Sequence, residues 1–208
     1  MIGRAGRGRF FLHLAVLIGL TLGSGCAHSN PERFYVLTGA PRSTGAPPPA
    51  VTATGTGAAA VGIGPVSLPS YLDRIQIVTR RGAQLEVAEF DRWGEPLSEG
   101  VPRALAANLA ALLQSERVVV YPWPVGRTVE LQVVVDVTRF DGVVGGDVLL
   151  EARWRVFARD RKELLLRSST VRETTGGPGY LALVSAMDRS LAALSREIAD
   201  SIRELPTR

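Results

Sequence analysis

The chain has 208 residues, with 24 Lys and Arg against 20 Asp and Glu, and it holds a single cysteine. Arg4, Arg7 and Arg9 lie at the N-terminus, and without them the chain holds 21 basic and 20 acidic residues. This near neutrality gives no support for a nucleic-acid partner, because no basic stripe interleaved with aromatic residues is left. The lone cysteine excludes a disulfide framework or a thiolate metal site within one subunit.

The N-terminus has the layout of a secretory signal peptide. Basic residues come first, an apolar run follows from 10 to 22, and small residues lead to Cys26. A cysteine at the cleavage point is typical of a bacterial lipoprotein, so we predict a lipoprotein signal peptide over 1–25 and a covalent acyl (palmitate) or diacylglycerol anchor on Cys26. A retained membrane-spanning anchor is disfavoured, since the run is short of the roughly 20 apolar residues that such a helix needs.

An ordinary cleaved signal peptide is the alternative. The usual lipobox has Leu three residues before the cysteine, whereas this chain has Gly23 there and Leu22 one place further back. Ser24 and Gly25 still supply the small side chains that lipobox processing requires. Ala27 follows the cysteine in place of Asp, and resemblance to lipoproteins as a class then implies the outer membrane.

Residues 26–60 are predicted to form a tether with one short strand. The apolar patch 34–37 has β-type composition, and the segment 38–60 is rich in Gly, Pro, Ala, Ser and Thr, so we predict a flexible linker or long loop there. If the patch docks, about eight residues separate the lipid from the domain, a reach of roughly 27 Å. If it does not dock, the tether is a coil spanning roughly 30–35 Å.

Residues 61–208 have the patterns of one folded domain. Short strands are predicted at 61–67, 75–79 and 84–90. An alanine-rich helix follows, and Pro96 and Pro102 bracket its start. Its apolar residues recur at helical spacing: Val101, Leu105, Leu109, Leu112 and Leu113.

The second half of the domain predicts an antiparallel meander covered by a long helix. After an apolar strand at 118–121, apolar and polar residues alternate over 129–138 and 148–159, and a third strand covers 163–171. The last helix, after 176–179, carries one apolar stripe: Val184, Met187, Leu191, Leu194, Ile198, Ile202 and Leu205. We predict the mixed α/β (α+β) class, a two-layer sandwich of a mostly antiparallel sheet with two amphipathic helices on one face. A coiled-coil partner for the last helix is the alternative.

The motifs of catalysis are not found in this sequence. His28 is the only histidine after the signal segment, and it lies two residues from the predicted anchor. Neither a nucleophile elbow nor a phosphate-binding glycine loop nor a cluster with metal-ligand spacing is found. We therefore expect no enzyme, no metal and no cofactor other than the anchor on Cys26.

Two runs, 68–74 and 90–97, combine proline, aromatic residues and Asp-Arg pairs. As plain structure, Asp73 or Asp91 accepts backbone hydrogen bonds and Arg74 or Arg92 pairs with a carboxylate. As recognition surface, the same residue types dominate interface hot spots. The candidates for partner contact or structural support are Pro69, Tyr71, Leu72, Asp73, Arg74, Arg92 and Trp93.

These motifs resemble the PqiC-type family of ABC-type transport auxiliary lipoproteins. The similarity covers Phe34-Tyr35-x-Leu37, the run from Gly64 to Arg80, Arg92-Trp93-x-Glu95-Pro96-Leu97 and the terminal helix from Tyr180. It implies a lipoprotein on the periplasmic face of the outer membrane that serves an inner-membrane system built around MCE-domain proteins, and it implies a homo-oligomeric ring. Catalytic residues do not carry over, because the family has none that are known.

The sequence therefore predicts a non-enzymatic outer-membrane lipoprotein that assists a lipid transport system and maintains the envelope. Its expected partners are an MCE-domain periplasmic protein, an inner-membrane ABC or PqiA-type permease, and the membrane itself through the lipid. A scaffold lipoprotein of outer-membrane or lipopolysaccharide assembly is the alternative. Direct lipid carriage in a groove between sheet and helices is a third possibility, and it predicts co-purified lipid.

Overall fold

The computed structural model describes residues 30–39, 59–124 and 126–206. The chain divides into two units, Met1–Pro31 and Glu32–Arg208, and the second is the unit described here. The predicted signal peptide over 1–25, Cys26 and most of the linker lie outside the described residues.

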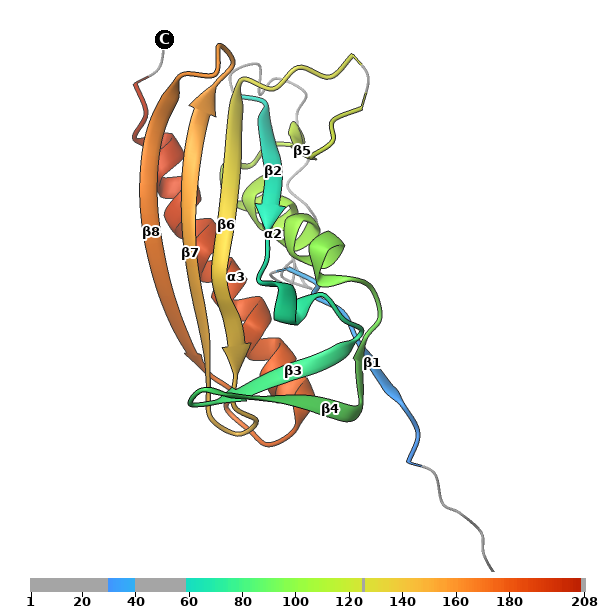
Figure 1. Ribbon diagram of the computed structural model, residues 1–208. Coiled ribbons are helices and arrows are strands. Elements are labelled where there is room, and N and C mark those ends of the chain that lie inside the picture. Colours follow the sequence, from blue (N-terminus) through green and yellow to red (C-terminus); the bar gives the residue numbers. More distant parts are fainter. Residues whose placement is uncertain (1–29, 40–58, 125, 207–208) are drawn as a thin grey trace, which may run out of the picture. The chain divides into compact units, whose positions relative to one another are not determined.

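The larger sheet contains the predicted meander. Its strands are β2 (Val61–Ser67), β5 (Val118–Val120), β6 (Leu131–Gly142), β7 (Asp147–Ala158) and β8 (Glu163–Thr174), in the spatial order β5-β2-β6-β7-β8. The pairs β6–β7 and β7–β8 are antiparallel, which confirms the meander (Figure 1). The strand β2 is parallel to both of its neighbours, β5 and β6, so the sheet is mixed at this edge.

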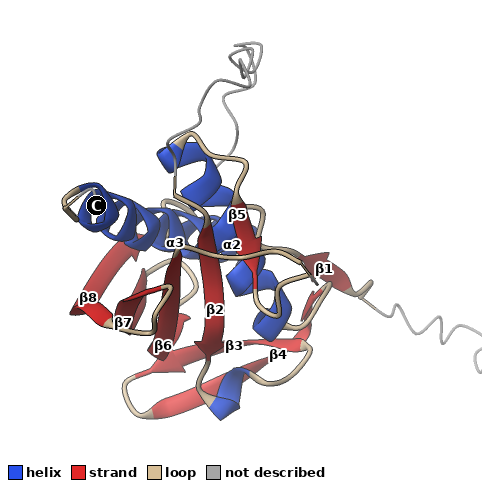
Figure 2. Ribbon diagram, turned by 90° about the horizontal axis from the view of Figure 1, so that it is seen from above, coloured by secondary structure: helices blue, strands red, loops and turns tan. Residues whose placement is uncertain are grey.

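Two helices cover one face of this sheet, as predicted. They are α2 (Leu97–Leu113) and α3 (Tyr180–Arg203), and both lie on the same side of the sheet when it is seen from above (Figure 2). The helix α2 begins directly after Pro96 and contains Pro102. The α3 stripe is buried from Val184 to Ile202, because the meander strands turn their apolar residues toward it. The mixed α/β class and the helix stripe are both confirmed.

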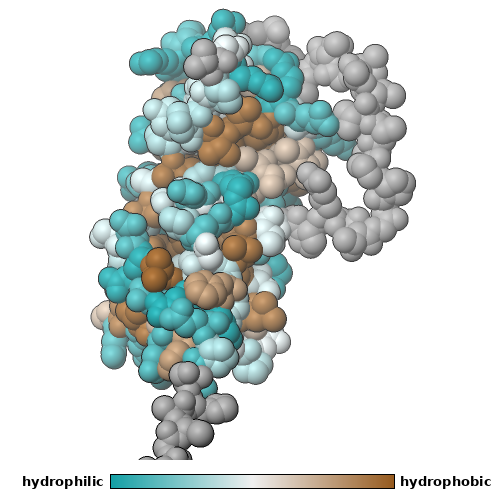
Figure 3. Space-filling view, turned by 90° about the vertical axis from the view of Figure 1, so that its right-hand side faces the viewer, coloured by the Kyte–Doolittle hydropathy of each residue, from teal (hydrophilic) through white to brown (hydrophobic). Residues whose placement is uncertain are grey.

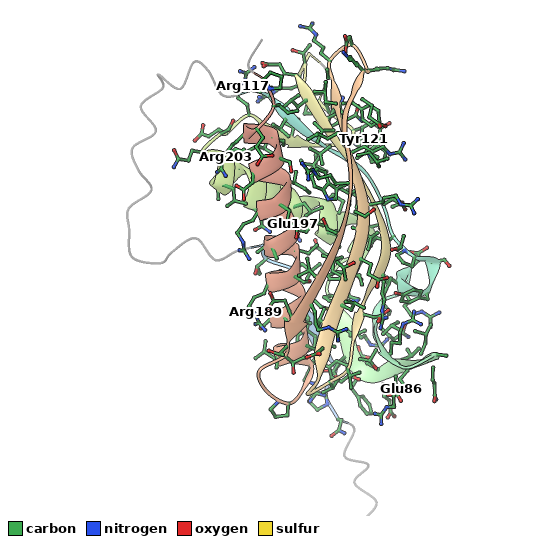
Figure 4. All side chains as sticks on the ribbon, turned by 90° about the vertical axis from the view of Figure 1, so that its left-hand side faces the viewer. Glu86, Arg117, Tyr121, Arg189, Glu197 and Arg203 are labelled. Atoms are coloured by element: carbon green, nitrogen blue, oxygen red, sulfur yellow. The ribbon has the colours of Figure 1, made fainter. Side chains whose placement is uncertain are left out.

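Polar contacts attach α3 to its neighbours along its length. Arg189, in the first half of the helix, donates through Nη2 to the Thr174 carbonyl at 2.5 Å, and Arg203, the last residue of the helix, donates to the Leu112 carbonyl of α2 at 2.6 Å. Between them Glu197 accepts a hydrogen bond from Ser169 of β8. The three α3 residues follow one another along the helix in Figure 4.

A second, three-stranded sheet was not predicted. It consists of β1 (Arg33–Tyr35), β4 (Gln84–Trp93) and β3 (Gln76–Arg81), in the order β1-β4-β3, and a short 3-10 helix, η1 (Ser70–Leu72), precedes it. The strands β3 and β4 cross one end of the larger sheet, on the side away from the helices (Figures 1 and 2). The strand β1 is parallel to β4, so the apolar patch after the predicted anchor docks into the domain.

Candidate functional site: the docked N-terminal strand

A buried carboxylate fastens β1 to the domain. Asp91 of β4 is only 2% exposed and lies directly beside Arg33 in the strand register. Arg33 donates to both of its oxygens at 2.8 Å, and the Tyr35 hydroxyl donates to Oδ1 at 2.7 Å. The hydrogen bonds from Arg33 hold the pKa of Asp91 below its usual value, which keeps the carboxylate charged. Burial raises the pKa of Tyr35, which keeps this donor protonated.

Two further contacts extend this attachment along the same strand. Glu32, just before β1, pairs with Arg92 of β4 at 2.5 Å. At the other end of β1 the Gly94 amide donates to the Tyr35 carbonyl at 2.7 Å. The strand is therefore held from its first residue to its last.

The chain after β1 is fastened to α3. Leu37 is 1% exposed and belongs to the core. Asp188 of α3 then accepts from the Thr38 amide and hydroxyl, each at 3.1 Å, and from the Gly39 amide at 3.3 Å. Burial raises the pKa of Asp188 against the opposing effect of these hydrogen bonds. Residues 32–39 are thus joined to both the small sheet and the helix layer.

A second buried carboxylate, Asp141, joins the two sheets. It lies in β6 with 0% exposure. It accepts from Tyr71 of η1 at 2.6 Å, from Arg80 of β3 at 2.9 Å and from Arg139 at 3.0 Å. The Arg80 guanidinium also stands 5.0 Å from the centre of the Tyr71 ring. Burial, followed by the hydrogen bond to Asp141, raises the pKa of Tyr71, so the phenol remains a donor.

The seven candidate residues divide by exposure. Buried or half-buried are Pro69, Tyr71, Leu72, Arg92 and Trp93, whereas Asp73 and Arg74 are exposed. Tyr71 serves the Asp141 network, and Trp93 is 4% exposed within the core. Arg92 pairs with a carboxylate, as the structural alternative expects. Only Asp73 and Arg74 of this set present their side chains to solvent.

Sequence reasoning missed the partners that complete these networks. It named Asp91 as an acceptor from the backbone, whereas Asp91 accepts from the side chains of Arg33 and Tyr35. It assigned no role to Asp141 or Arg80. The only signal in the sequence was an acidic residue directly after the apolar Phe140, and the burial of this position is seen only in the structure.

Metal ligands do not gather in the described ranges, where no group of three or more His, Cys, Asp or Glu could hold an ion. Across the same residues, neither α2 nor α3 combines the length and apolar character of a membrane span. His28 lies outside this part of the chain.

The fold is a small mixed α/β domain, and the N-terminal segment 32–39 of the same chain is attached to it by strand pairing and hydrogen bonds. Residues 35–199 match the family described as "ABC-type transport auxiliary lipoprotein component", and the chain belongs to this family. The resemblance drawn from the motifs is therefore confirmed, and with it the general role of a transport auxiliary lipoprotein.

Solved structures share the fold. The crystal structure of an uncharacterized protein has a TM-score of 0.66 at 22% identity and covers 83% of this chain and 99% of its own. A DUF330-family protein from Xanthomonas campestris has a TM-score of 0.54 at 16% identity and covers 67% of this chain and 81% of its own. A comparison with curated proteins found no match.

Proposed function

We propose that this protein is a non-enzymatic auxiliary subunit of an MCE-type lipid transport system, held on the periplasmic face of the outer membrane by a lipid on Cys26. The docking of β1 is the observation that carries the proposal. Arg33 is the seventh residue after Cys26, which limits the span between them to about 25 Å. A lipid on Cys26 would thus keep the domain beside the bilayer, as an accessory to a membrane-bound machine requires.

The chemistry of the buried carboxylates supports a role in binding rather than catalysis. Asp91 and Asp141 both accept hydrogen bonds from arginine and tyrosine side chains. Carboxylates whose oxygens already accept several hydrogen bonds serve to hold strands and helices together, whereas a general base needs a free lone pair directed at a substrate proton. The acyl or diacylglycerol group on Cys26 is the only covalent group in the proposal, with no further cofactor.

The proposed partners follow from the family. Its description refers to an ABC-type transporter. We take the neighbour to be an MCE-domain periplasmic protein working with an ABC or PqiA-type permease, and we include assembly of several copies into a ring. Asp73 and Arg74 are the exposed members of the seven candidate residues, so among these they are the ones available for partner contact.

The anchor is tested by Cys26→Ser in the full chain. The variant should lose its lipid by mass spectrometry and should leave the membrane fraction. Ser24→Ala is the matched control, because it keeps a small residue before the cysteine and should be processed normally. Membrane fractionation of Cys26→Ser without a change in mass relative to the parent protein contradicts the anchor.

The transport role is tested by cross-linking the lipidated protein in its native envelope. Recovery of an MCE-domain protein supports the proposal, and Arg74→Glu should weaken this cross-link if the 68–74 loop makes the contact. Recovery of outer-membrane or lipopolysaccharide assembly factors alone contradicts it and supports the scaffold alternative.

A further inference from the structure

The face of the larger sheet that points away from α2 and α3 is not covered by a helix. In Figure 1 it faces the reader, with both helices behind it and the strands β3 and β4 across one end only. On the strand β7, Trp154 and Val156 are buried in the core. The residues that alternate with them, Arg153, Arg155 and Phe157, therefore point to the open side, which we call the outer face.

Apolar side chains surround Arg155 on the outer face. In the strand register Arg155 lies between Val134 of β6 and Leu166 of β8. Directly opposed residues of antiparallel strands share a face, so these three side chains adjoin one another. Val134 is half-buried and Leu166 is 57% exposed. Phe157, two residues further along β7, is half-buried and extends the apolar surface by one row.

Two aromatic rings continue the outer face toward β5. Val61 and Ile63 are buried in the core, so Gly62 between them faces outward. A Cβ placed on Gly62 would come within 2.5 Å of the Trp123 ring, which therefore lies against the glycine. The Tyr121 ring stands edge-on to Trp123 with the ring centres 5.2 Å apart, and Tyr121 is 52% exposed.

The figures agree with this placement. Tyr121 is on the side of the sheet away from α3 in Figure 4. Figure 3 looks onto the edge of the molecule where β5 lies, and apolar side chains gather in its upper half with polar ones around them. Gln132 lies between Gly62 and Phe157 in the register, and its Nε2 donates to the Gly64 carbonyl at 2.9 Å. The polar group between the two apolar areas is thus already bound to the backbone.

Arg155 has no charge partner on this surface. Within the described ranges its guanidinium makes no hydrogen bond or ion pair, and both of its cross-strand neighbours are apolar. The acidic residues of the outer face lie opposite other arginines in the register, Asp136 opposite Arg153 and Glu151 opposite Arg139. An exposed arginine next to aromatic and aliphatic side chains is typical of an interface hot spot, and a carboxylate is the group that its guanidinium binds most strongly.

The charges of the outer face indicate the kind of occupant. An anionic lipid surface would be repelled by Asp136 and Glu151, whereas a protein can place a charge of matching sign opposite each group. A two-fold contact between copies that is centred on this surface would bring two Arg155 side chains toward the same axis. Both arguments favour a different protein, with an apolar surface that carries a carboxylate.

We propose that the outer face binds a partner protein that places a carboxylate against Arg155 and apolar side chains against Leu166, Phe157 and Tyr121. This inference rests on the proposed function, because it gives the protein partner of the transport role its contact surface. It assigns this surface to a protein rather than to lipid or to a second copy of the chain.

The test places the photo-cross-linking residue benzoylphenylalanine at position 166 of the full-length lipidated protein in its native envelope. The same probe at position 181 is the control, since Leu181 is 70% exposed but lies in the helix layer, at the start of α3. The probe at 166 should form an adduct with one protein, and the probe at 181 should not. Mass spectrometry of the cross-linked peptide should place the adduct beside an Asp or Glu that apolar residues flank.

Charge reversal tests the role of Arg155 in this adduct. Arg155→Glu should lower the yield of the adduct roughly tenfold, because it sets two negative charges against each other. Arg155→Ala adds no charge and should give a smaller loss in the same direction. Arg196→Glu is the matched control, since Arg196 is exposed on α3, and its yield should equal that of the parent protein. Thermal unfolding of each variant checks that the domain stays folded.

A change in the partner completes the test. Replacing the mapped carboxylate by Lys should restore the adduct of Arg155→Glu, and failure to restore it overturns the Arg155 contact. An adduct of the 166 probe with lipid or with a second copy overturns the inference, and so does a yield no higher than that of the 181 probe. Recovery of an MCE-domain protein by cross-linking elsewhere on the chain would then exclude only the outer face, whereas failure of both experiments would exclude the proposed function as well.

Discussion

Each of the two sheets of this domain is held in place by a different combination of contacts. The five-stranded sheet packs its apolar face against α2 and α3, and Trp154, Leu191 and Leu194 are each 0–1% exposed there. The three-stranded sheet also buries apolar residues, among them Ile77, Val78 and Trp93, and in addition it is attached through the carboxylates of Asp91 and Asp141. A segment as short as β1 cannot stabilise itself by burying apolar area, so a buried charge with matched donors takes that role.

The contrast predicts that the larger sheet controls global stability. Trp154→Ala removes a side chain that is 1% exposed and whose Nε1 donates to Ser169 at 2.9 Å. The expected loss is about 3–5 kcal/mol of the free energy of unfolding, from lost burial and a residual cavity. Denaturant unfolding followed by circular dichroism measures it. Phe157→Ala, at a half-buried position of the same strand, should cost clearly less.

Asp141 tests the junction between the sheets. Asp141→Asn keeps the shape of the side chain but removes the charge that faces Arg80 and Arg139, and the expected cost is about 2–4 kcal/mol. Asp136→Asn is the matched control on β6, because Asp136 is exposed and contacts Ser67. Equal losses of unfolding free energy in the two variants would show that the buried Asp141 network stabilises the domain no more than an exposed hydrogen bond does.

Asp91 tests the attachment of β1 alone. In Asp91→Asn, Arg33 loses its charged partner, so amides around β1 should exchange roughly tenfold faster while the exchange of β6 and β7 stays unchanged. Hydrogen exchange with mass spectrometry measures both regions in one experiment. Asp73→Asn, an exposed position, serves as control. Uniform acceleration across both sheets would contradict a local attachment.

The smallest expected effect is a pH dependence confined to the same region. The pKa of Asp91 lies below its usual value of 3.8. The stabilisation that the charged carboxylate gives to the folded state is therefore complete above pH 3.8, and it is lost as the pH falls through the lowered pKa. The effect of Asp188 on stability has the opposite pH dependence. Burial raises its pKa by penalising the charged form, and protonation in acid removes that penalty. Exchange around β1 should therefore accelerate only in strong acid, and this acid step should be absent in Asp91→Asn.

The sequence predicted the elements better than their partners. Alternation over 129–138 and the stripe from Val184 to Ile202 located β6 and α3, because periodicity reports which face of an element is buried. The same periodicity does not report the neighbouring strand. The parallel pairing of β2 and the separate β1-β4-β3 sheet therefore had no local signal.

The candidate site was predicted in part for a similar reason. Tyr71, Arg92 and Trp93 stood out by residue type, and the structure gives each of them a defined contact or a place in the core. Their exposure could not be read from type alone. The partner of Tyr71 is Asp141, 70 residues further along, and a pairing at that separation is set by the tertiary fold rather than by spacing.

The parallel alignment of β1 with β4 also has a mechanical consequence. A pull on the chain before Glu32 that is directed along β1 would load the Arg33–Asp91 pair and the β1–β4 hydrogen bonds in shear rather than open them one by one. From β4 the force passes through β3 and the Arg80–Asp141 pair into β6. Traction on the N-terminus is thereby delivered to the longest strands of the domain rather than to its loops.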